Sequence, residues 1–478
     1  MTDFSSVFFS SITDINKRLR AKEFSAVELT RAFCDRLEKV GPRYNALVIS
    51  LRESAVKKAK DVDSDLKIDR TRGPLQGIPF GVKDLIAVKG HPTTWGAKPY
   101  ASQVFSDDAL VIEKLHKTGA ILIGKLSMVE LAGGGGYRFA NASLTGPGLN
   151  PWDRSRWSGG SSSGPGAATA AGLVTFALGS ETSGSIITPS AYCGVTGLRP
   201  TYGLVSRRGA MALSWTLDKL GPMCRSAEDC GLVLQVIAGA DPTDPGTAGA
   251  NFFYTPQFAR KPQDLTIGYA PVDFEEWADE PTRAGFRAAL EVVKSLGYKL
   301  KEVELPDFPY GALTGVIVAA ESASIFEDLI RSGKVDQLAD HRQAAGLKAA
   351  LETPAVDYLK AMRVRALVQQ AFKDLFLDVD MLMAPSRLSV ATKVSEPLDG
   401  SGGGPEPARP KSRGMSGIIP AGNLAGLPAI SVPCGFANDL PIGISFVARP
   451  LHENLLIAAG KAYQSQTDWH KRTPKIEI

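Results

Sequence analysis

Two serine-rich segments contain the residues best suited to chemistry. The first places three successive hydroxyls, at 161–163, after Gly159-Gly160 and before Pro165. Because proline favours the first turn of a helix, we expect these serines at a helix N-terminus, where unpaired N–H groups and the helix dipole stabilise an anion. The alternative interpretation is a serine-rich helix cap without chemistry.

The second segment, residues 179–189, places Ser185 after a run of small residues. Such residues allow a tight turn whose N–H groups point to one side and suit an oxyanion. Serine is a weak nucleophile until a base removes its proton, so Ser185 needs such a base nearby. The alternative is a polar loop between a strand and a helix.

Histidine is a poor candidate for this base. The chain has five histidines in 478 residues, and none forms an HExxH or HxH pattern, so we expect neither a histidine relay nor a histidine-based metal site. Lys83 ends the apolar segment 77–84; burial lowers the pKa of a lysine, and its neutral amine then accepts a proton. Serine–lysine pairs are a known form of the serine relay. The alternative is a surface lysine beside Asp84.

The run from Gly159 to Pro200 resembles the signature segment of the amidase signature family. The resemblance covers most of the chain in family order, and it implies an α/β fold: an α/β/α sandwich with a large mixed central sheet flanked by helices. The other similar pieces are GIPFGVKDLI (77–86), GAILIGKLSMVEL (119–131), NPWD (150–153), TYGLVSRRG (201–209), DKLGPMCRS (218–226) and NLAGLPAISVPCGF (423–436).

The resemblance also implies a Ser–cis-Ser–Lys catalytic triad. Lys83 is then the base, Ser161 the bridging serine after a cis peptide bond, and Ser185 the nucleophile. Neutral Lys83 would take the proton of Ser185 through Ser161, and Ser185 would attack a carbonyl carbon to form an acyl-enzyme. The matching oxyanion hole consists of the backbone amides of Thr182, Ser183, Gly184 and Ser185.

Two features depart from the family pattern. Ser183 stands where members commonly have glycine, and it adds a side chain to the oxyanion loop. Many members also place an arginine two or three residues after the nucleophile, where this chain has Ile187 and Thr188. In some members that arginine binds a substrate carboxylate, and its loss removes a charge-assisted pair. We therefore expect small neutral substrates with a carboxamide, anilide or carbamate bond.

Five further residues are candidates for substrate binding. Family members line the acyl pocket at positions matching Met128, Leu131 and Tyr137, although ordinary packing is an equal alternative. Thr188 follows the nucleophile closely, and Trp215 is either pocket wall or core.

Three functions are compatible with these features. The first is a free-standing amidohydrolase or urethanase, similar to aryl-acylamidases. The second is the glutamine-hydrolysing A-type subunit of an amidotransferase. Two features argue against this function: the absent arginine, and the departure of the segment 133–137 from the family pattern. The third, a non-catalytic scaffold of the same fold, is disfavoured because all three triad positions are filled.

Periodic apolar residues indicate the elements that position the site. Two amphipathic helices are expected within 11–40, αβ alternation over 77–124 and 264–305, and helices over 313–375. We predict one domain over 1–478, with a signature core at about 70–225, a helical insertion at about 310–376 and a mobile loop at about 399–413.

Composition limits the remaining possibilities. The net charge is +4, without a dense basic run, so no nucleic-acid partner is expected. No apolar run approaches about 18 residues, which predicts no membrane span. Five cysteines without a CxxC pair, and no signal peptide, indicate reduced thiols in the cytoplasm. We expect no cofactor, no metal, and a monomer or homodimer.

Overall fold

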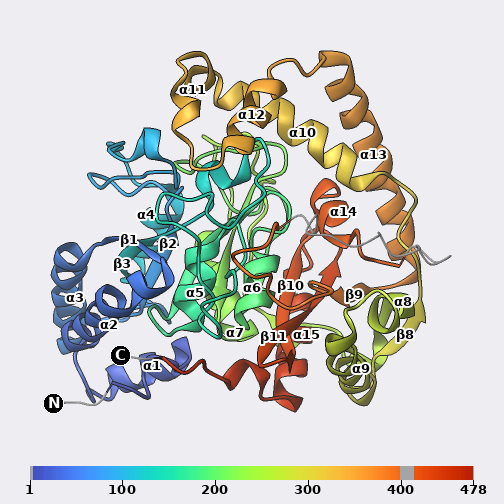
Figure 1. Cartoon of the computed structure of the whole chain (residues 1–478). Coiled ribbons are helices and arrows are strands. Elements are labelled where there is room, and N and C mark those ends of the chain that lie inside the picture. Colours follow the sequence, from blue (N-terminus) through green and yellow to red (C-terminus); the bar gives the residue numbers. More distant parts are fainter. Residues whose placement is uncertain (1–3, 399–413, 477–478) are drawn as a thin grey trace.

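The computed structural model describes residues 4–398 and 414–476, and the predicted mobile loop 399–413 lies outside them. Its centre is one mixed eleven-stranded sheet in the order β1-β3-β2-β4-β6-β5-β10-β11-β9-β7-β8 (Figure 1). The α/β architecture with a large mixed sheet is thereby confirmed. The strands are β1 (Leu47–Ser50), β2 (Pro79–Lys83), β3 (Ile121–Leu126), β4 (Phe176–Glu181), β5 (Thr196–Arg199), β6 (Lys219–Cys224), β7 (Thr266–Tyr269), β8 (Lys299–Glu302), β9 (Met381–Pro385), β10 (Ala429–Ala437) and β11 (Leu440–Ala448).

The pairing of β2 and β4 decides where the site forms. The two strands are parallel, with Phe80 opposite Phe176 and Val82 opposite Leu178. Parallel strands end at the same edge of a sheet. Lys83, the last residue of β2, therefore lies next to the end of β4, where the segment leading to Ser185 begins.

Helices cover the sheet in two different ways. The outer helices are amphipathic, as the sequence predicts within 11–40, and Ser25 begins α2 with a capping box. In contrast, α5 and α6 are buried along their whole length, which their small residues permit. The helices of this half are α1 (Ile12–Arg20), α2 (Ala26–Val40), α3 (Arg52–Lys67), α4 (Leu110–Lys117), α5 (Ser163–Ala170), α6 (Ile187–Cys193) and α7 (Ala227–Ile237).

The second half contains a predicted αβ unit and a helical cluster. The strands β7 and β8 pair in parallel, and α9 lies between them in the chain, as the αβ alternation over 264–305 predicts. The cluster α10–α13 lies beside the sheet, at the top and right of Figure 1, and it matches the helices predicted over 313–375. The remaining helices are α8 (Pro271–Glu275), α9 (Glu280–Ser295), α10 (Tyr310–Ile325), α11 (Glu327–Arg331), α12 (His341–Ala350), α13 (Ala355–Asp378), α14 (Ile418–Leu424) and α15 (Glu453–Gln466).

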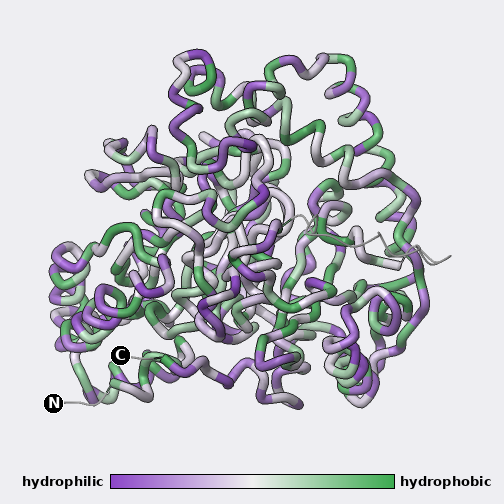
Figure 2. The backbone as a smooth tube through the Cα atoms, in the orientation of Figure 1, coloured by the Kyte–Doolittle hydropathy of each residue, from purple (hydrophilic) through white to green (hydrophobic). Residues whose placement is uncertain are grey.

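Strands from both ends of the chain share the one sheet, and the single-domain organisation stays a prediction. Figure 2 shows hydrophilic residues recurring along outer helices such as α3 and α9. No helix in the described ranges is long and apolar enough to cross a membrane.

Several cations are buried with the core, and some of them, including Lys83 and Lys219, form no ion pair within the described residues. The ammonium of Lys125 pairs with Asp84 at 2.8 Å, and Arg199 pairs with Glu181 at 2.9 Å. Lys83 is fully buried, yet within the described residues it forms no ion pair with a carboxylate. The alternative of a surface lysine beside Asp84 is therefore wrong. A buried lysine without a counter-ion is a candidate for chemistry.

Candidate active site

Three residues predicted from the sequence form one hydrogen-bonded chain. Lys83 Nζ donates to Ser161 Oγ at 2.7 Å, and Ser161 Oγ donates to Ser185 Oγ at 3.0 Å. All three side chains are buried, with Ser185 8% exposed. This arrangement connects a nucleophilic hydroxyl to an amine through one intermediate hydroxyl.

The protonation of Lys83 suits the role of a base. Burial lowers its pKa to about 7, although the negative charges of Asp218 and Glu181 act in the opposite direction. Lys83 Nζ also donates to Ser180 Oγ at 2.9 Å, so two hydroxyls hold the amine in place. At neutral pH a large share of the amine is then unprotonated and able to accept a proton.

Close packing explains the two glycines before Ser161. Gly159 has φ +87, and a Cβ atom there would lie 2.6 Å from Pro189 Cα. A Cβ atom on Gly160 would lie 2.5 Å from the ring of Trp157. The peptide bond between Gly160 and Ser161 is cis, as the family resemblance implies. These contacts place Ser161 just before α5, the helix that the sequence predicts here.

The loop that carries Ser185 is held by a buried carboxylate. Glu181 Oε2 accepts hydrogen bonds from the amides of Ile186 and Ile187, at 2.8 and 3.0 Å. Burial alone would raise the pKa of Glu181, but Arg199 and a hydrogen bond from Asn423 lower it to about 2. Glu181 is therefore ionised at neutral pH and fixes the turn after the nucleophile.

The predicted oxyanion loop has free amides. Within the described residues, the N–H groups of Ser183, Gly184 and Ser185 donate to no partner. Gly184 has φ +91, a conformation that favours glycine, whereas Ser183 does not lie in that region. Serine at 183 is therefore compatible with the turn, and its side chain is exposed. The role of these amides in binding an oxyanion stays a prediction.

The buried carboxyl group of Asp218 connects the predicted oxyanion loop to a second backbone segment. Thr182 Oγ1 donates to Asp218 at 2.6 Å, and the amides of Leu213 and Ser214 donate to its other oxygen at 2.8 and 2.9 Å. Burial raises the pKa of Asp218 while these hydrogen bonds oppose the rise. One carboxyl group thus ties the start of the oxyanion loop to residues 213–214.

A cavity of about 560 Å³ opens in front of Ser185. This volume suits a small organic molecule. None of the described lining residues carries a charge. The lining residues are Ala132, Gly133, Gly135, Gly136, Tyr137, Thr182, Ser183, Ser185, Leu213, Gly311, Thr314, Gly315, Val318, Ala319, Gly346 and Pro420. Arg387 is not among them; it lies beside Tyr192, whose proximity raises the pKa of the guanidinium.

The far wall of this cavity is made by α10 and α12, and it approaches the glycine loop 133–136 very closely. A Cβ atom on Gly346 would lie 1.9 Å from the carbonyl oxygen of Gly135. Glu130 holds the two parts together, since its carboxylate accepts from the amides of Ala339 and Asp340 at 3.0 and 2.9 Å. On the same wall, the buried hydroxyl of Thr314 has no hydrogen-bond partner within the described structure.

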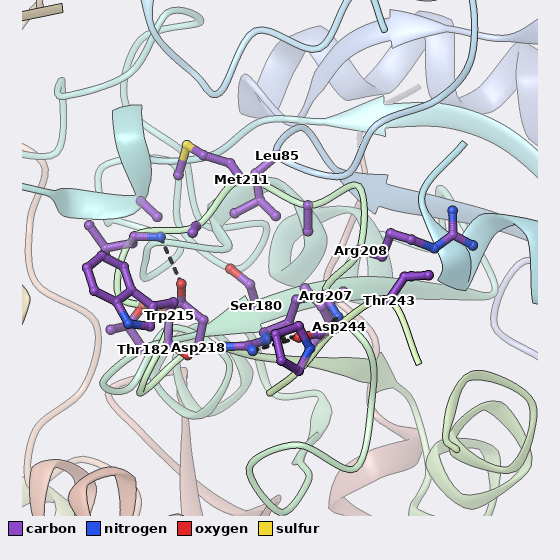
Figure 3. A pocket seen from close by; sticks show the side chains of 16 residues that line it. Leu85, Ser180, Thr182, Arg207, Arg208, Met211, Trp215, Asp218, Thr243 and Asp244 are labelled. Carbon is purple, nitrogen blue, oxygen red and sulfur yellow. Dashed lines mark hydrogen bonds and ion pairs between the residues drawn. The ribbon is translucent and has the colours of Figure 1, made fainter. Parts of the chain in front are cut away.

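A second cavity of about 230 Å³ lies on the other side of Thr182. Figure 3 shows Ser180 near its centre, with Trp215 and Arg208 at opposite ends. Arg207 is paired with Asp244 at 3.0 Å and is not a free cation. Ser180, which accepts a hydrogen bond from Lys83, is part of the lining of this cavity, whereas Lys83 itself is not.

The structure brings together some of the predicted substrate-binding residues and not others. Tyr137 lines the cavity at Ser185, and Trp215 lines the second cavity, half-exposed. Met128 and Leu131 are fully buried in the main core, and Thr188 is buried as well; none of the three lines either cavity. Leu131 lies in a turn with a left-handed backbone, at φ +49, and its side chain packs in the core.

Sequence reasoning missed several residues of the site. Ser180 lies within the quoted segment 179–189, but its contact with Lys83 depends on the pairing of β2 with β4. Asp218 also lies in a quoted family segment, DKLGPMCRS, so a signal existed for it. Thr314 and Gly346 lie on helices that carry no motif, and nothing in the sequence marked them.

Comparisons with known proteins identify the family of this chain. A family model described as Amidase matches residues 28–457. The A-type subunit of glutamyl-tRNA(Gln) amidotransferase from Gloeothece citriformis is 37% identical, over 98% of this chain and 99% of the relative. The structure of peptide amidase from Stenotrophomonas maltophilia has a TM-score of 0.85 at 28% identity, covering 99% of each chain. That of the A-type amidotransferase subunit from Thermotoga maritima has a TM-score of 0.77 at 26% identity, covering 100% of each. The match over most of its length shows that this chain belongs to the amidase family, whose enzymes hydrolyse carbon–nitrogen bonds.

Proposed function

We propose that this chain hydrolyses a carboxamide C–N bond through an acyl-enzyme on Ser185. The observation that carries the proposal is the chain of hydrogen bonds from Lys83 through Ser161 to Ser185, which ends on a buried amine without a counter-ion. Burial of a lone cation is unfavourable, so the surroundings of Lys83 favour its neutral amine, which hydrogen bonds then connect to Ser185. These residues therefore fit best with a neutral Lys83 that acts as a base.

In the proposed mechanism, Ser185 Oγ attacks the carbonyl carbon while its proton moves to Ser161 Oγ, and the proton of Ser161 moves to Lys83 Nζ. The amides of Ser183, Gly184 and Ser185 stabilise the negative charge on the tetrahedral oxygen. The same path then returns a proton to the leaving nitrogen, and the C–N bond breaks. Water attacks the acyl-enzyme in the second half-reaction, with Lys83 again accepting a proton.

For the substrate, the relatives favour glutamine, hydrolysed by this chain as the A-type component of an amidotransferase. The sequence alone favours a free-standing amidase over this role. The named relatives reverse that order, since they are 37% to 35% identical and are matched along 94% or more of their length. In this role the chain would work with partner subunits.

The second candidate is a free-standing amidase for neutral amides, anilides or carbamates. It is favoured by the cavity at Ser185, whose described lining offers no charged side chain for the amino acid end of glutamine. The higher structural similarity to peptide amidase than to the Thermotoga amidotransferase subunit points the same way.

Ammonia release separates the two roles. The purified chain is assayed with glutamine and with neutral primary amides of similar length, alone and after pull-down from a source of its natural partners, with Ser185→Ala as the blank. Hydrolysis of glutamine that rises with a co-purified protein supports the amidotransferase role. Efficient hydrolysis of neutral amides by the chain alone supports the free-standing role. Failure of Ser185 to react with a fluorophosphonate, together with no activity on either substrate, would contradict the proposal itself.

A further inference from the structure

The outer face of α13 is unusually apolar for a solvent-exposed helix. Four large aliphatic side chains lie on it: Val356, Leu359, Leu367 and Leu377 are 54%, 60%, 59% and 81% exposed. The opposite face of α13 is the buried one, with Phe372 and Phe376 in the core. In Figure 1, α13 lies at the margin of the molecule. Exposed apolar residues that gather on one helix face indicate an interaction surface.

The exposed residues of this face follow a seven-residue spacing. One row contains Val356, Arg363, Gln370 and Leu377, all exposed. A neighbouring row, again at intervals of seven, contains Lys360, Leu367 and Asp374. Residues at this spacing lie along one stripe of a helix, which is the pattern of helices that pair lengthwise.

The order of residues along the stripe is self-complementary. Leu367 lies seven residues from Lys360 on one side and seven from Asp374 on the other. In the described part of the chain, neither of these two charges takes part in an ion pair; Asp374 accepts a hydrogen bond from Gln370 at 3.0 Å. A two-fold axis near Leu367 would therefore oppose each lysine to an aspartate.

We propose that α13 pairs with α13 of a second copy of this chain, antiparallel, about a two-fold axis near Leu367. Each Lys360 then faces Asp374 of the other copy, and Leu367 meets its own equivalent at the centre. Val356 and Leu377 then lie within one residue of facing each other, as do Arg363 and Gln370. A two-fold interface uses the same patch on both copies, so a self-complementary stripe is what such an interface requires.

The geometry of the helix allows this pairing. With 24 residues, α13 is about 36 Å long, and the opposed charges lie about 10 Å to either side of the axis. The proposal is independent of the reaction, because none of these side chains lines the cavity at Ser185.

Charge reversal and its rescue test the proposal on the full-length chain. Sedimentation equilibrium should give twice the chain mass of 50.8 kDa for the wild type. Lys360→Asp and Asp374→Lys should each weaken the dimer roughly tenfold or more, because each puts two like charges together. The double variant, with both residues exchanged, should restore the affinity of the wild type to within a few-fold.

Two further variants complete the test. Leu367→Lys should give a folded monomer, since the residue is exposed and contributes nothing to the core of its own chain. Ile68→Lys, at a 72% exposed site at the end of another helix, is the matched control and should leave the dimer intact. A wild type that stays monomeric up to about 100 μM, or one that pairs only with a different protein, overturns the proposal. So does a dimer that Leu367→Lys leaves unchanged.

Discussion

The two walls of the cavity at Ser185 are built differently. The wall with Lys83, Ser161 and Ser185 is held by short hydrogen bonds and by glycines packed against backbone. The opposite wall, from α10 and α12, offers small residues and a hydroxyl without a partner, that of Thr314. In the proposed reaction the first wall supplies the reacting groups, and we expect the second wall to select the acyl group.

Because the two walls are built from different elements, we expect the reaction and the choice of substrate to depend on separate parts of the fold. Lys83 ends β2, Ser185 follows the parallel neighbour β4, and Ser161 precedes the buried helix α5, so these groups are held by the sheet and by a helix packed in the core. The selective groups come from helices outside that sheet. Changes to the first wall should therefore affect turnover or folding, and changes to the second should affect substrate preference.

The largest expected effect comes from removing the nucleophile. Ser185→Ala should lower kcat for amide hydrolysis by about 10⁴-fold or more, because no other hydroxyl occupies its place in the relay. Ser183→Ala, two residues earlier and exposed, is the matched control and should stay within a few-fold of the wild type. An equal loss of kcat in Ser185→Ala and Ser183→Ala would show that the conformation of the loop, and not the hydroxyl of Ser185, limits the rate.

Removing the charge that holds the nucleophile loop should affect folding. Glu181→Gln leaves Arg199 buried without a counter-ion, so we expect a loss of about 3–5 kcal/mol in the free energy of unfolding. Denaturant unfolding measures it. Glu327→Gln breaks the exposed pair with Arg331 and should cost under about 0.5 kcal/mol. A Glu181→Gln protein as stable as this control would contradict the rigidity ascribed to the first wall.

The pH profile tests the state of Lys83. Protonated lysine accepts no proton, so kcat/KM should fall about tenfold per pH unit below the pKa of about 7 and level off above it. Ser180→Ala removes an acceptor that stabilises the charged amine, so the midpoint should move to lower pH, with a modest loss of kcat. A midpoint that Ser180→Ala leaves in place would exclude this serine from holding the base.

The smallest expected effect lies on the second wall. Thr314→Val keeps the shape of the side chain and removes the unpartnered hydroxyl. For amides with a polar acyl group, KM should rise about three- to tenfold at constant kcat, as expected for one lost hydrogen bond. Amides with an apolar acyl group serve as the control and should show no increase. A change in kcat instead would place Thr314 on the reactive wall.

The sequence predicted the first wall far better than the second. Glycines and apolar neighbours made Ser161, Ser185 and Lys83 candidates, and the resemblance to the amidase signature family implied their roles. Ser180 was missed because its partner is decided by strand register, which no short segment contains. Thr314 was missed because it lies far along the chain, on a helix with ordinary composition. Met128 and Leu131 show the related difficulty that proximity to a site does not reveal the direction of a side chain.

The contact between Gly135 and Gly346 has a consequence for altering the enzyme. No side chain separates the two backbones, so the helices of the second wall already stand as near to the glycine loop as atoms allow. Any added carbon at Gly346 acts as a spacer, and the gap between the walls has to widen by about the size of a methyl group. We therefore expect the lack of a Cβ atom at Gly346 to limit the size of the substrates that the cavity admits. A series of successively larger small side chains at position 346 should change that size in steps.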